Sequence, residues 1–271
     1  MLGSVQTVED RLAQWAALHD LGKRAGTLKF HKEVLNSIRG RFDCQQLADG
    51  VTVQAVQDFA GKVTHFCPSR WNAIVTVLRF VTPHAQLLKR RKLRFREFSP
   101  PTAEQFSALL SELDKARSQG GLVVRFLALT GLRFGEAKKL RWQNVHQDRI
   151  EVPACVAKSG KARSVPFVPG TSETVQRLRG ENTPAPLSLV LPKPNVRKAL
   201  SKACQKVGLP LLSYHCYRHL FATRCIESGV DMPTVARWLG HQDGGALLSR
   251  MYFHLLDDHS RLMAARVKIC V

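Results

Sequence analysis

The sequence has few tyrosines, few acidic residues and no long apolar run. It contains 3 tyrosines, and 21 acidic residues stand against 41 lysines and arginines, for a formal net charge of +20 at pH 7. The sequence contains no run of about 18 apolar residues, the length that a membrane-spanning helix requires. The first residues lack the basic-then-apolar order of a signal peptide. We therefore expect a cytoplasmic protein with no membrane partner. The positive charge favours a polyanion as partner, although charge alone leaves open a merely basic soluble protein.

Paired cysteines are also missing. The 7 cysteines are odd in number and scattered, with no C-x-x-C pair. This pattern favours reduced thiols and argues against a disulfide framework or a structural zinc site. His215 and His219 have a spacing that could bind a metal on a helix, but the glutamate of an H-E-x-x-H motif is absent. We expect no metal and no cofactor.

The length of 271 residues and the pattern along the chain predict two domains. Between residues 8 and 80, apolar residues recur at helical spacing in successive short stretches, as in a small helical bundle, and Thr7 is a candidate N-cap of the first helix. A basic run follows, and then Ser99, Pro100 and Pro101. Two consecutive prolines disfavour helix and sheet alike, so we place the boundary here, between residues 1–95 and 96–271.

The second domain combines helices with one short β region. Thr102 and Gln105 have the spacing of a capping box for a helix that ends near residue 116. Residues 122–142 predict an apolar helix, a glycine break and an amphipathic helix. Residues 149–152 and 164–168 are β-like and predict a hairpin or a small three-stranded sheet, with Pro166 on an edge strand. The expected fold class is mainly α (α+β), a helical bundle followed by a mixed domain with a small antiparallel sheet.

Residues 211–254 hold four groups suited to handling a phosphodiester, namely His215, Arg218, His241 and Tyr252. The first two are three residues apart, so a helix that begins near residue 214 would place them on one face. Gly229 and Asp231 predict a helix stop and a new N-cap, and Gly240 ends the short second helix.

The pattern H-C-Y-R-H-L-F-A-T, followed by L-G-H and then by a tyrosine, resembles the C-terminal half of the tyrosine recombinases, the phage integrase family. T-G-L-R-F-G-E and A-K-S-G-K-A-R-S-V-P match further family motifs in the family's order. The resemblance is strong from residue 130 onward and rests on helical texture before residue 100. It implies that residues 1–95 form a core-type DNA-binding domain, half of a clamp around DNA, and that residues 96–271 form the catalytic domain.

The resemblance also implies a set of catalytic residues: Arg133, Lys158, His215, Arg218, His241 and Tyr252. A guanidinium is planar, always charged and bidentate, which suits phosphate oxygens. Glu136 is implied to support Arg133. Lys158 is implied to donate a proton to the leaving 5′-hydroxyl, with Lys161 as the fallback. The two histidines would hold phosphate oxygens and take part in proton transfer, while His219 has a supporting, structural role.

Of the three tyrosines, Tyr252 is the candidate nucleophile. Tyr214 and Tyr217 flank His215 at a helix start, and Tyr217 continues an apolar stripe, so we expect both to be packing residues. Tyr252 lies beyond the last short helix. A free tyrosine hydroxyl has a pKa of about 10, so attack near neutral pH requires help from a base or from cations. Whether Tyr252 acts in cis or in trans stays open.

The basic run before the two prolines has two interpretations. It contains six cations, namely Lys89, Arg90, Arg91, Lys92, Arg94 and Arg96. Such a run is often only a solvated linker. Between two halves of a clamp it would instead lie along the phosphate backbone of DNA.

The implied activity is site-specific recombination through a 3′-phosphotyrosyl intermediate. The implied assembly is a homotetramer on two sites of double-stranded DNA, with the apolar residues of 262–269 compatible with tail packing on a neighbour; we expect a monomer without DNA. Two alternatives remain. One is a non-catalytic regulator, because residues 217–239 resemble a helix-turn-helix that could read a groove. The other is a relaxing enzyme like the type IB topoisomerases, which would use the same nucleophile.

Overall fold

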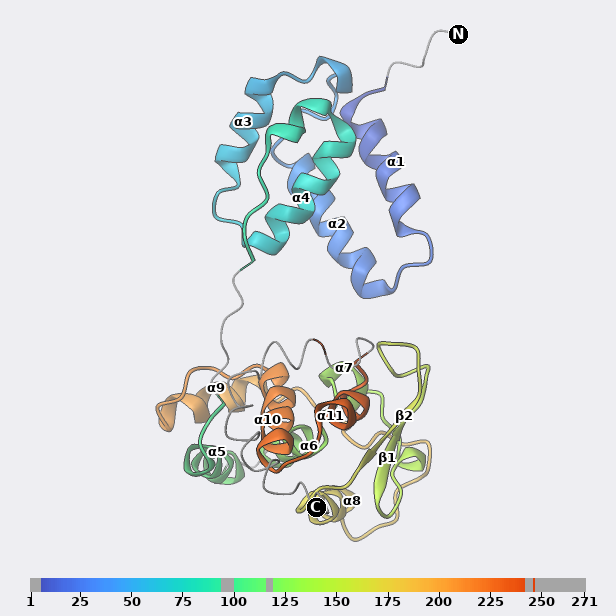
Figure 1. Ribbon diagram of the computed structural model, residues 1–271, viewed down its shortest axis with the longest axis vertical. Helices are drawn as coiled ribbons and strands as arrows, with labels where there is room; N and C mark the ends of the chain where they lie inside the picture. Colours follow the sequence, from blue (N-terminus) through green and yellow to red (C-terminus); the bar gives the residue numbers. More distant parts are fainter. Residues whose placement is uncertain (1–5, 94–99, 116–118, 242–245, 247–271) are drawn as a thin grey trace, which may run out of the picture. The chain divides into compact units, whose positions relative to one another are not determined.

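The computed structural model describes residues 6–93, 100–115, 119–241 and 246. The chain divides into two compact units, residues 1–96 and residues 97–271 (Figure 1). Each unit has its own core of buried apolar side chains.

The first unit is a bundle of helices, as the sequence predicts. It consists of α1 (Val8–Asp20), α2 (Ala25–Arg39), α3 (Val53–Lys62) and α4 (Pro68–Val81), with 3-10 turns at Ala48–Gly50 and Pro83–Leu87. Thr7 caps α1 as expected, since its hydroxyl accepts from the Asp10 amide at 3.1 Å. α4 begins with a proline, at a position where the missing N–H has no helical partner. It contacts both α1 and α2 and supplies Trp71, Ile74 and Leu78 to the core.

The chain that leaves this bundle is docked on α4. Trp71 donates its indole N–H to the carbonyl of Lys89 at 2.9 Å. The Asn72 side chain exchanges two hydrogen bonds with the backbone of Arg91, at 2.9 and 2.8 Å. Because these bonds hold its backbone, the first part of the basic run belongs to the first unit.

The second unit is built around α6 (Gly120–Thr130), which contacts α5 (Ala103–Lys115), α8 (Thr171–Arg179) and α10 (Tyr214–Glu227). α9 (Arg197–Lys206) packs on α5, and α11 (Met232–Leu239) packs on α10 (Figure 1). The predicted capping box of α5 is present, because Thr102 and Gln105 exchange hydrogen bonds of 3.0 and 3.2 Å.

The β region is an antiparallel hairpin of β1 (Arg149–Val152) and β2 (Arg163–Pro166). Ile150 is paired with Val165, and both side chains are buried in the core. Within the described residues the sheet has two strands, so the hairpin prediction is confirmed and the three-stranded alternative is not. β2 packs against α11, which brings the hairpin next to the end of that helix.

At the glycine break after α6, the backbone of Gly131 lies close to side chains of α10 and α11. Gly131 has φ +60°, in the left-handed region. A Cβ on this residue would lie 2.5 Å from Cδ1 of Phe221 on α10 and 2.8 Å from Cδ2 of Leu239 on α11. The helix that follows, α7 (Phe134–Ala137), is a single turn and is shorter than predicted, because the chain turns so that Leu140 and Trp142 enter the core.

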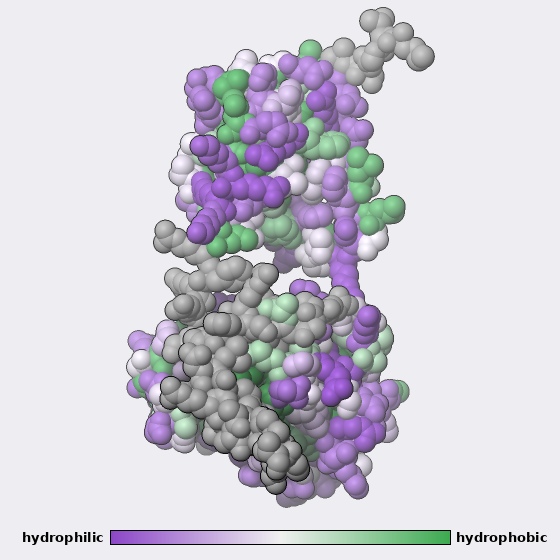
Figure 2. Space-filling model, in the orientation of Figure 1, coloured by the Kyte–Doolittle hydropathy of each residue, from purple (hydrophilic) through white to green (hydrophobic). Residues whose placement is uncertain are grey.

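Hydrophilic residues cover much of the face shown in Figure 2, and the apolar side chains there form separate patches. Among the described residues, no helix combines the length and the apolar character needed to cross a membrane.

Candidate active site at the end of α11

The end of α11 is the point on which the candidate residues converge. The helix begins at Asp231, whose carboxylate accepts from the amide of Thr234 at 2.8 Å, and ends at Gly240 with φ +68°. The last carbonyls of a helix lack helical partners and carry partial negative charge. The carbonyls of residues 238–240 therefore attract cations.

Three arginines meet these carbonyls. Arg218 Nη2 donates to Leu239 O at 2.7 Å, and Arg133 Nη1 approaches the same oxygen at 3.4 Å. Arg133 Nη2 lies 3.5 Å from the carbonyl of Gly240. Arg163 Nε donates to the carbonyl of residue 238 at 2.8 Å. Two of these arginines are the sequence candidates, and the third comes from the hairpin.

Arg133 and Arg218 differ in exposure. The Arg218 residue on α10 is 3% exposed, and its Nη1 also donates to Gly131 O at 2.9 Å, which ties α10 to the glycine break. The side chain of Arg133 keeps 24% of its surface in solvent. Arg133 is therefore the more accessible of the two guanidinium groups.

A buried carboxylate binds two of the three arginines, Arg133 and Arg163. The side chain of Glu136 is 2% exposed and accepts from Arg163 at 3.2 and 2.6 Å and from Arg133 Nη1 at 3.2 Å. The amides of Arg133 and Lys158 also donate to it, at 3.1 and 3.3 Å. Burial raises the pKa of this carboxyl, but the Arg163 hydrogen bonds and charge, with the two amides, outweigh burial and lower the pKa to about 2. Glu136 is thus ionised at neutral pH.

Lys158 lies in the loop between β1 and β2 with an exposed side chain. The hydrogen bond from its backbone amide to Glu136 connects this loop to the carboxylate that binds Arg133 and Arg163. Its positive charge is among the causes that lower the pKa of His215, after burial and the charges of Arg218 and Arg133. Lys161 is in the same loop, and its amide lies 3.5 Å from the hydroxyl of Ser159. The structure therefore places Lys158, the first choice from the sequence, beside the other candidates.

The histidines lie together on this side of the unit. The rings of His215 and His219 make an edge-on contact with centroids 4.5 Å apart. Burial, followed by the charges of His215, Arg218 and His241, lowers the pKa of His219 to about 4. With the pKa of His215 also lowered, both rings are neutral at pH 7. The amide of His241 donates to Ala236 O at 3.0 Å and so continues the end of α11.

Within the described part of the chain, no three histidine, cysteine or acidic side chains are grouped so that they could hold a metal ion.

Tyr214 and Tyr217 are packing residues, as predicted. Tyr217 is 1% exposed in the core, and burial raises the pKa of its hydroxyl. The Tyr214 hydroxyl accepts from the Val196 amide at 2.8 Å, its ring stacks on Phe134, and burial raises its pKa as well. Both hydroxyls are therefore poor nucleophiles. Tyr252 lies outside the described residues.

The basic run is only partly exposed. Lys89, Arg90 and Lys92 are exposed. Arg91 instead donates to backbone carbonyls of the first unit at 3.0 and 2.7 Å and lies 4.7 Å from the centre of the Trp71 ring. Arg94 and Arg96, like the tail at 262–269, lie outside the described residues.

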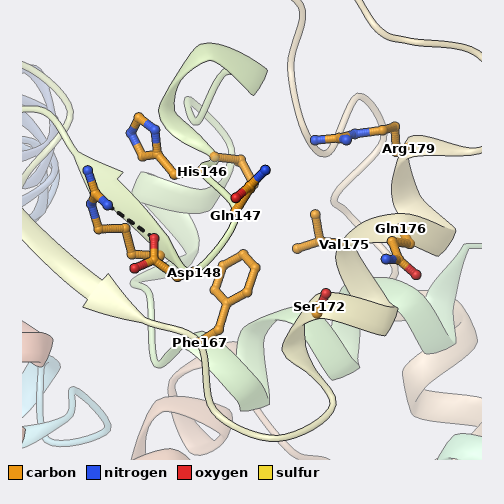
Figure 3. Close-up of a pocket in the computed structure, with 10 residues that line it drawn as sticks. His146, Gln147, Asp148, Phe167, Ser172, Val175, Gln176 and Arg179 are labelled. Atoms are coloured by element: carbon orange, nitrogen blue, oxygen red, sulfur yellow. Dashed lines mark hydrogen bonds and ion pairs between the residues drawn. The ribbon is translucent and has the colours of Figure 1, made fainter.

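A separate pocket of about 640 Å³ lies beside the hairpin (Figure 3). His146 and Asp148 line it from the chain that enters β1, Phe167 follows β2, and Arg179 comes from α8. None of the candidate residues lines this pocket.

The sequence reasoning missed Arg163. In the motif A-K-S-G-K-A-R-S-V-P it precedes the buried Val165 by two residues. Alternate residues of a strand point to the same face. An arginine on the inward face of a strand was the available signal, because a buried guanidinium requires a partner.

Several known proteins are similar in sequence to part of this chain. It is 27% identical over 172 residues to the tyrosine recombinase XerD of Lacticaseibacillus casei, covering 57% of this chain and 58% of that protein. It is 28% identical over 178 residues to XerA of Thermococcus kodakarensis, covering 62% of each. The integrase of Escherichia phage P2 is 31% identical over 155 residues, covering 56% of this chain and 42% of that protein. The chain thus spans less than two thirds of the length of these relatives.

Solved structures share the fold. The Tn1549 transposon integrase in complex with transposon right end DNA has a TM-score of 0.74 at 17% identity, covering 97% of this chain and 99% of that one. A lambda integrase dimer bound to a COC′ core site has a TM-score of 0.68 at 17% identity, covering 88% and 96%.

The model of the phage integrase family matches residues 102–259, more than half of the sequence and the whole of the described site. Together with the arrangement of the arginines, the lysine and the histidines, this match shows that the chain belongs to the phage integrase family.

Proposed function

We propose that this chain is a tyrosine-type site-specific DNA recombinase. One observation carries the proposal: two arginines, a lysine and two neutral histidines from separate segments are gathered around one buried carboxylate and one helix end. The relatives named tyrosine recombinases support it. So do the integrases of similar fold that were solved with DNA, among them a lambda integrase tetramer bound to a Holliday junction.

The proposed reaction transfers a phosphodiester to Tyr252 and back. The phenolic oxygen of Tyr252 forms a bond to phosphorus, the bond from phosphorus to the 5′-oxygen breaks, and a 3′-phosphotyrosyl link remains. The freed 5′-oxygen takes a proton and becomes a hydroxyl. The reverse steps join a 5′-hydroxyl to the phosphate and release the tyrosine. Each step exchanges one phosphodiester for another, so the cycle requires no ATP.

Arg133 and Arg218 would stabilise the transition state. Negative charge grows on the non-bridging phosphate oxygens during attack, and donors that are already oriented stabilise it at little reorganisation cost. Removal of one such donor typically slows a reaction about 10²–10³-fold. Glu136 would keep the Arg133 guanidinium in one orientation.

His215 and Lys158 would handle the two protons. A base must be unprotonated to accept the phenolic proton, and the lowered pKa of His215 leaves its ring neutral at pH 7. Lys158, exposed in the hairpin loop, would give a proton to the leaving 5′-oxygen. His241 would hold a phosphate oxygen, and His219 would support the ring of His215, which it contacts.

Double-stranded DNA is the proposed partner. Lys89, Arg90 and Lys92 are exposed and would contact phosphates, with Arg94 and Arg96 continuing the run. Arg91 would instead anchor the segment to the first unit. We propose that residues 1–95 and 96–271 form the two halves of a DNA clamp. The active assembly would be a homotetramer on two DNA sites, and the protein would be a monomer without DNA. Its location would be cytoplasmic and DNA-associated.

A groove-reading helix-turn-helix is disfavoured by the packing of α11. Val235, Ala236 and Leu239 are buried, and the C-terminal end of the helix receives three arginines. A regulator without chemistry has no use for such a constellation.

The test is trapping of a covalent complex in EDTA. A duplex selected by binding from a random library would be nicked near its centre, so that cleavage releases a short strand that cannot rejoin. We expect the wild type to form the adduct and Tyr252→Phe to form none. Tyr217→Phe is the matched control, because the Tyr217 hydroxyl has no hydrogen-bond partner among the described residues.

An adduct with Tyr252→Phe, or none with the wild type despite tight binding, would contradict the proposal. Relaxation of supercoiled plasmid that lacks the selected site would favour the topoisomerase instead.

A further inference from the structure

The side chain of Arg163 joins three segments of the second unit. It is 5% exposed and opens β2. Nη1 and Nη2 donate to the two oxygens of Glu136 at 3.2 and 2.6 Å, and Nε donates to Trp238 O at 2.8 Å. One planar group therefore connects the hairpin, α7 and the last turn of α11.

Arg133 and Lys158 depend on the carboxylate that Arg163 holds. Glu136 accepts from the Arg133 side chain and from its amide, at 3.2 and 3.1 Å, and from the Lys158 amide at 3.3 Å. The carbonyl of Trp238 lies in the turn that leads into His241. A displacement of Arg163 would thus reach three candidate groups, although the Arg163 side chain itself is buried.

The end of α11 is shaped around this arginine. Gly240 has φ +68°, and a Cβ built on it would lie 2.9 Å from Cδ, 3.1 Å from Nε and 3.2 Å from Nη1 of Arg163. The arginine side chain therefore packs directly on the backbone of the residue before His241. This contact is independent of the hydrogen bonds to Glu136.

We propose that Arg163 is a positioning residue for the phosphodiester reaction, which holds Arg133, through Glu136, in register with the end of α11 and His241. The inference rests on the proposed recombinase function. Misplacement of a reacting group by about 1 Å can cost about 10²-fold in rate. In metal sites, loss of a residue that orients a metal ligand lowers metal affinity or activity about 10–100-fold, and Arg163 would orient Arg133 in the same way.

Substitution by lysine separates positioning from stability. A lysine keeps the positive charge that the buried Glu136 requires, but it lacks the planar fork that binds both carboxylate oxygens and Trp238 O together. We expect Arg163→Lys to retain DNA affinity within about twofold and most of the stability, whereas adduct formation at saturating DNA slows about 10–100-fold. Arg163→Met should lose stability as well, because Glu136 is then buried with one charged partner fewer.

Two matched controls sharpen the experiment. Arg149→Lys changes the other strand of the hairpin, where the arginine makes exposed pairs with Asp148 and Glu151, and it should leave the adduct rate unchanged. Gly240→Ala should reproduce the slow adduct formation by pushing on Arg163. Gly208→Ala imposes a similar φ, +70°, with no atom within 4 Å of the new Cβ, and should leave the rate near that of the wild type.

Hydrogen exchange supplies a readout that does not depend on activity. In DNA-free protein, Arg163→Lys should speed amide exchange at Gly240 and His241 and leave the amides in the centre of α10 unchanged. Faster exchange together with a slower adduct rate supports the proposal. A wild-type adduct rate in Arg163→Lys, or unchanged exchange at these two amides, overturns it. If the wild type forms no adduct, the recombinase proposal fails, and the exchange result alone then decides whether Arg163 holds the end of α11.

Discussion

Replacing Glu136 by glutamine should remove a pH-dependent part of the stability of the second unit. The carboxyl is 2% exposed and holds two arginines, and its pKa falls from 4.5 to about 2 in the folded chain. The unfolded chain therefore takes up the proton first as the pH falls. The stabilisation is complete above pH 4.5 and is lost as the pH drops toward 2.

The size of the effect follows from the pKa. A decrease of the pKa from 4.5 to about 2 corresponds to about 3 kcal/mol of stability at neutral pH, because a pKa shift of one unit corresponds to about 1.4 kcal/mol. Glutamine cannot ionise and leaves Arg163 without its buried counter-charge, a loss of the same order, about 3–5 kcal/mol. We expect Glu136→Gln to be about 3 kcal/mol less stable than the wild type at pH 7, and the two stabilities to converge as the pH approaches 2.

The assay is urea unfolding at a series of pH values, followed by isoleucine methyl NMR. Ile150 and Ile226 are buried in the second unit, whereas Ile38 and Ile74 are buried in the first. The difference between wild type and variant should be confined to the signals of the second unit.

Glu151→Gln is the matched control for this experiment. Glu151 is 48% exposed and pairs with Arg149 at the surface, so its loss should cost less than about 1 kcal/mol. Parallel pH profiles for the wild type and Glu136→Gln would refute the reasoning, because the carboxyl would then have the same pKa in the folded and unfolded chain.

Gly131→Ala should destabilise the second unit by roughly 2–4 kcal/mol in urea unfolding, through its left-handed φ and the contacts of 2.5 and 2.8 Å to Phe221 and Leu239, whereas Gly135→Ala, with no atom within 4 Å of the new Cβ, should be neutral or slightly stabilising. In a histidine NMR titration His219 should stay neutral down to about pH 4, and His215 should titrate below its ordinary value; protonation of either ring near pH 6.5 would contradict the described burial and neighbouring charges. Lys158→Ala should slow cleavage about 10²–10⁴-fold on ordinary DNA and far less on DNA with a 5′-bridging sulfur, because a thiolate leaves without a proton, while Lys161→Ala should cleave both substrates normally. Lys92→Ala should reduce the salt dependence of DNA binding by about one phosphate contact and leave stability unchanged, whereas Arg91→Ala should destabilise the first unit, because it removes the bonds of 3.0 and 2.7 Å to that unit's backbone.

Local signals account for what the sequence predicted of the fold. The N-caps at Thr7 and Asp231 and the capping box at Thr102 depend on residues three apart in the chain, so the sequence alone specifies them. The hairpin follows from two β-like runs around a polar tip, and the buried pair of Ile150 and Val165 sets which face enters the core.

The parts that the sequence did not predict depend on contacts between distant residues. Arg163 and Glu136 are separated by 27 positions, and only the packed hairpin brings them together. In the sequence Arg91 is one of several cations in the basic run, but in the structure it donates to backbone carbonyls of the first unit. Helical spacing put His215 and Arg218 on one face but could not predict that Arg218 is buried beneath the end of α11.

The most direct test of the central claim is identification of the residue that becomes linked to DNA. Wild-type protein would be trapped on a nicked duplex in EDTA, digested, and analysed by tandem mass spectrometry for a nucleotide-bearing tyrosine. We predict a phosphodiester bond from the 3′ end of the cleaved strand to the hydroxyl of Tyr252. A nucleotide on Tyr214, Tyr217 or a non-tyrosine residue would contradict this account.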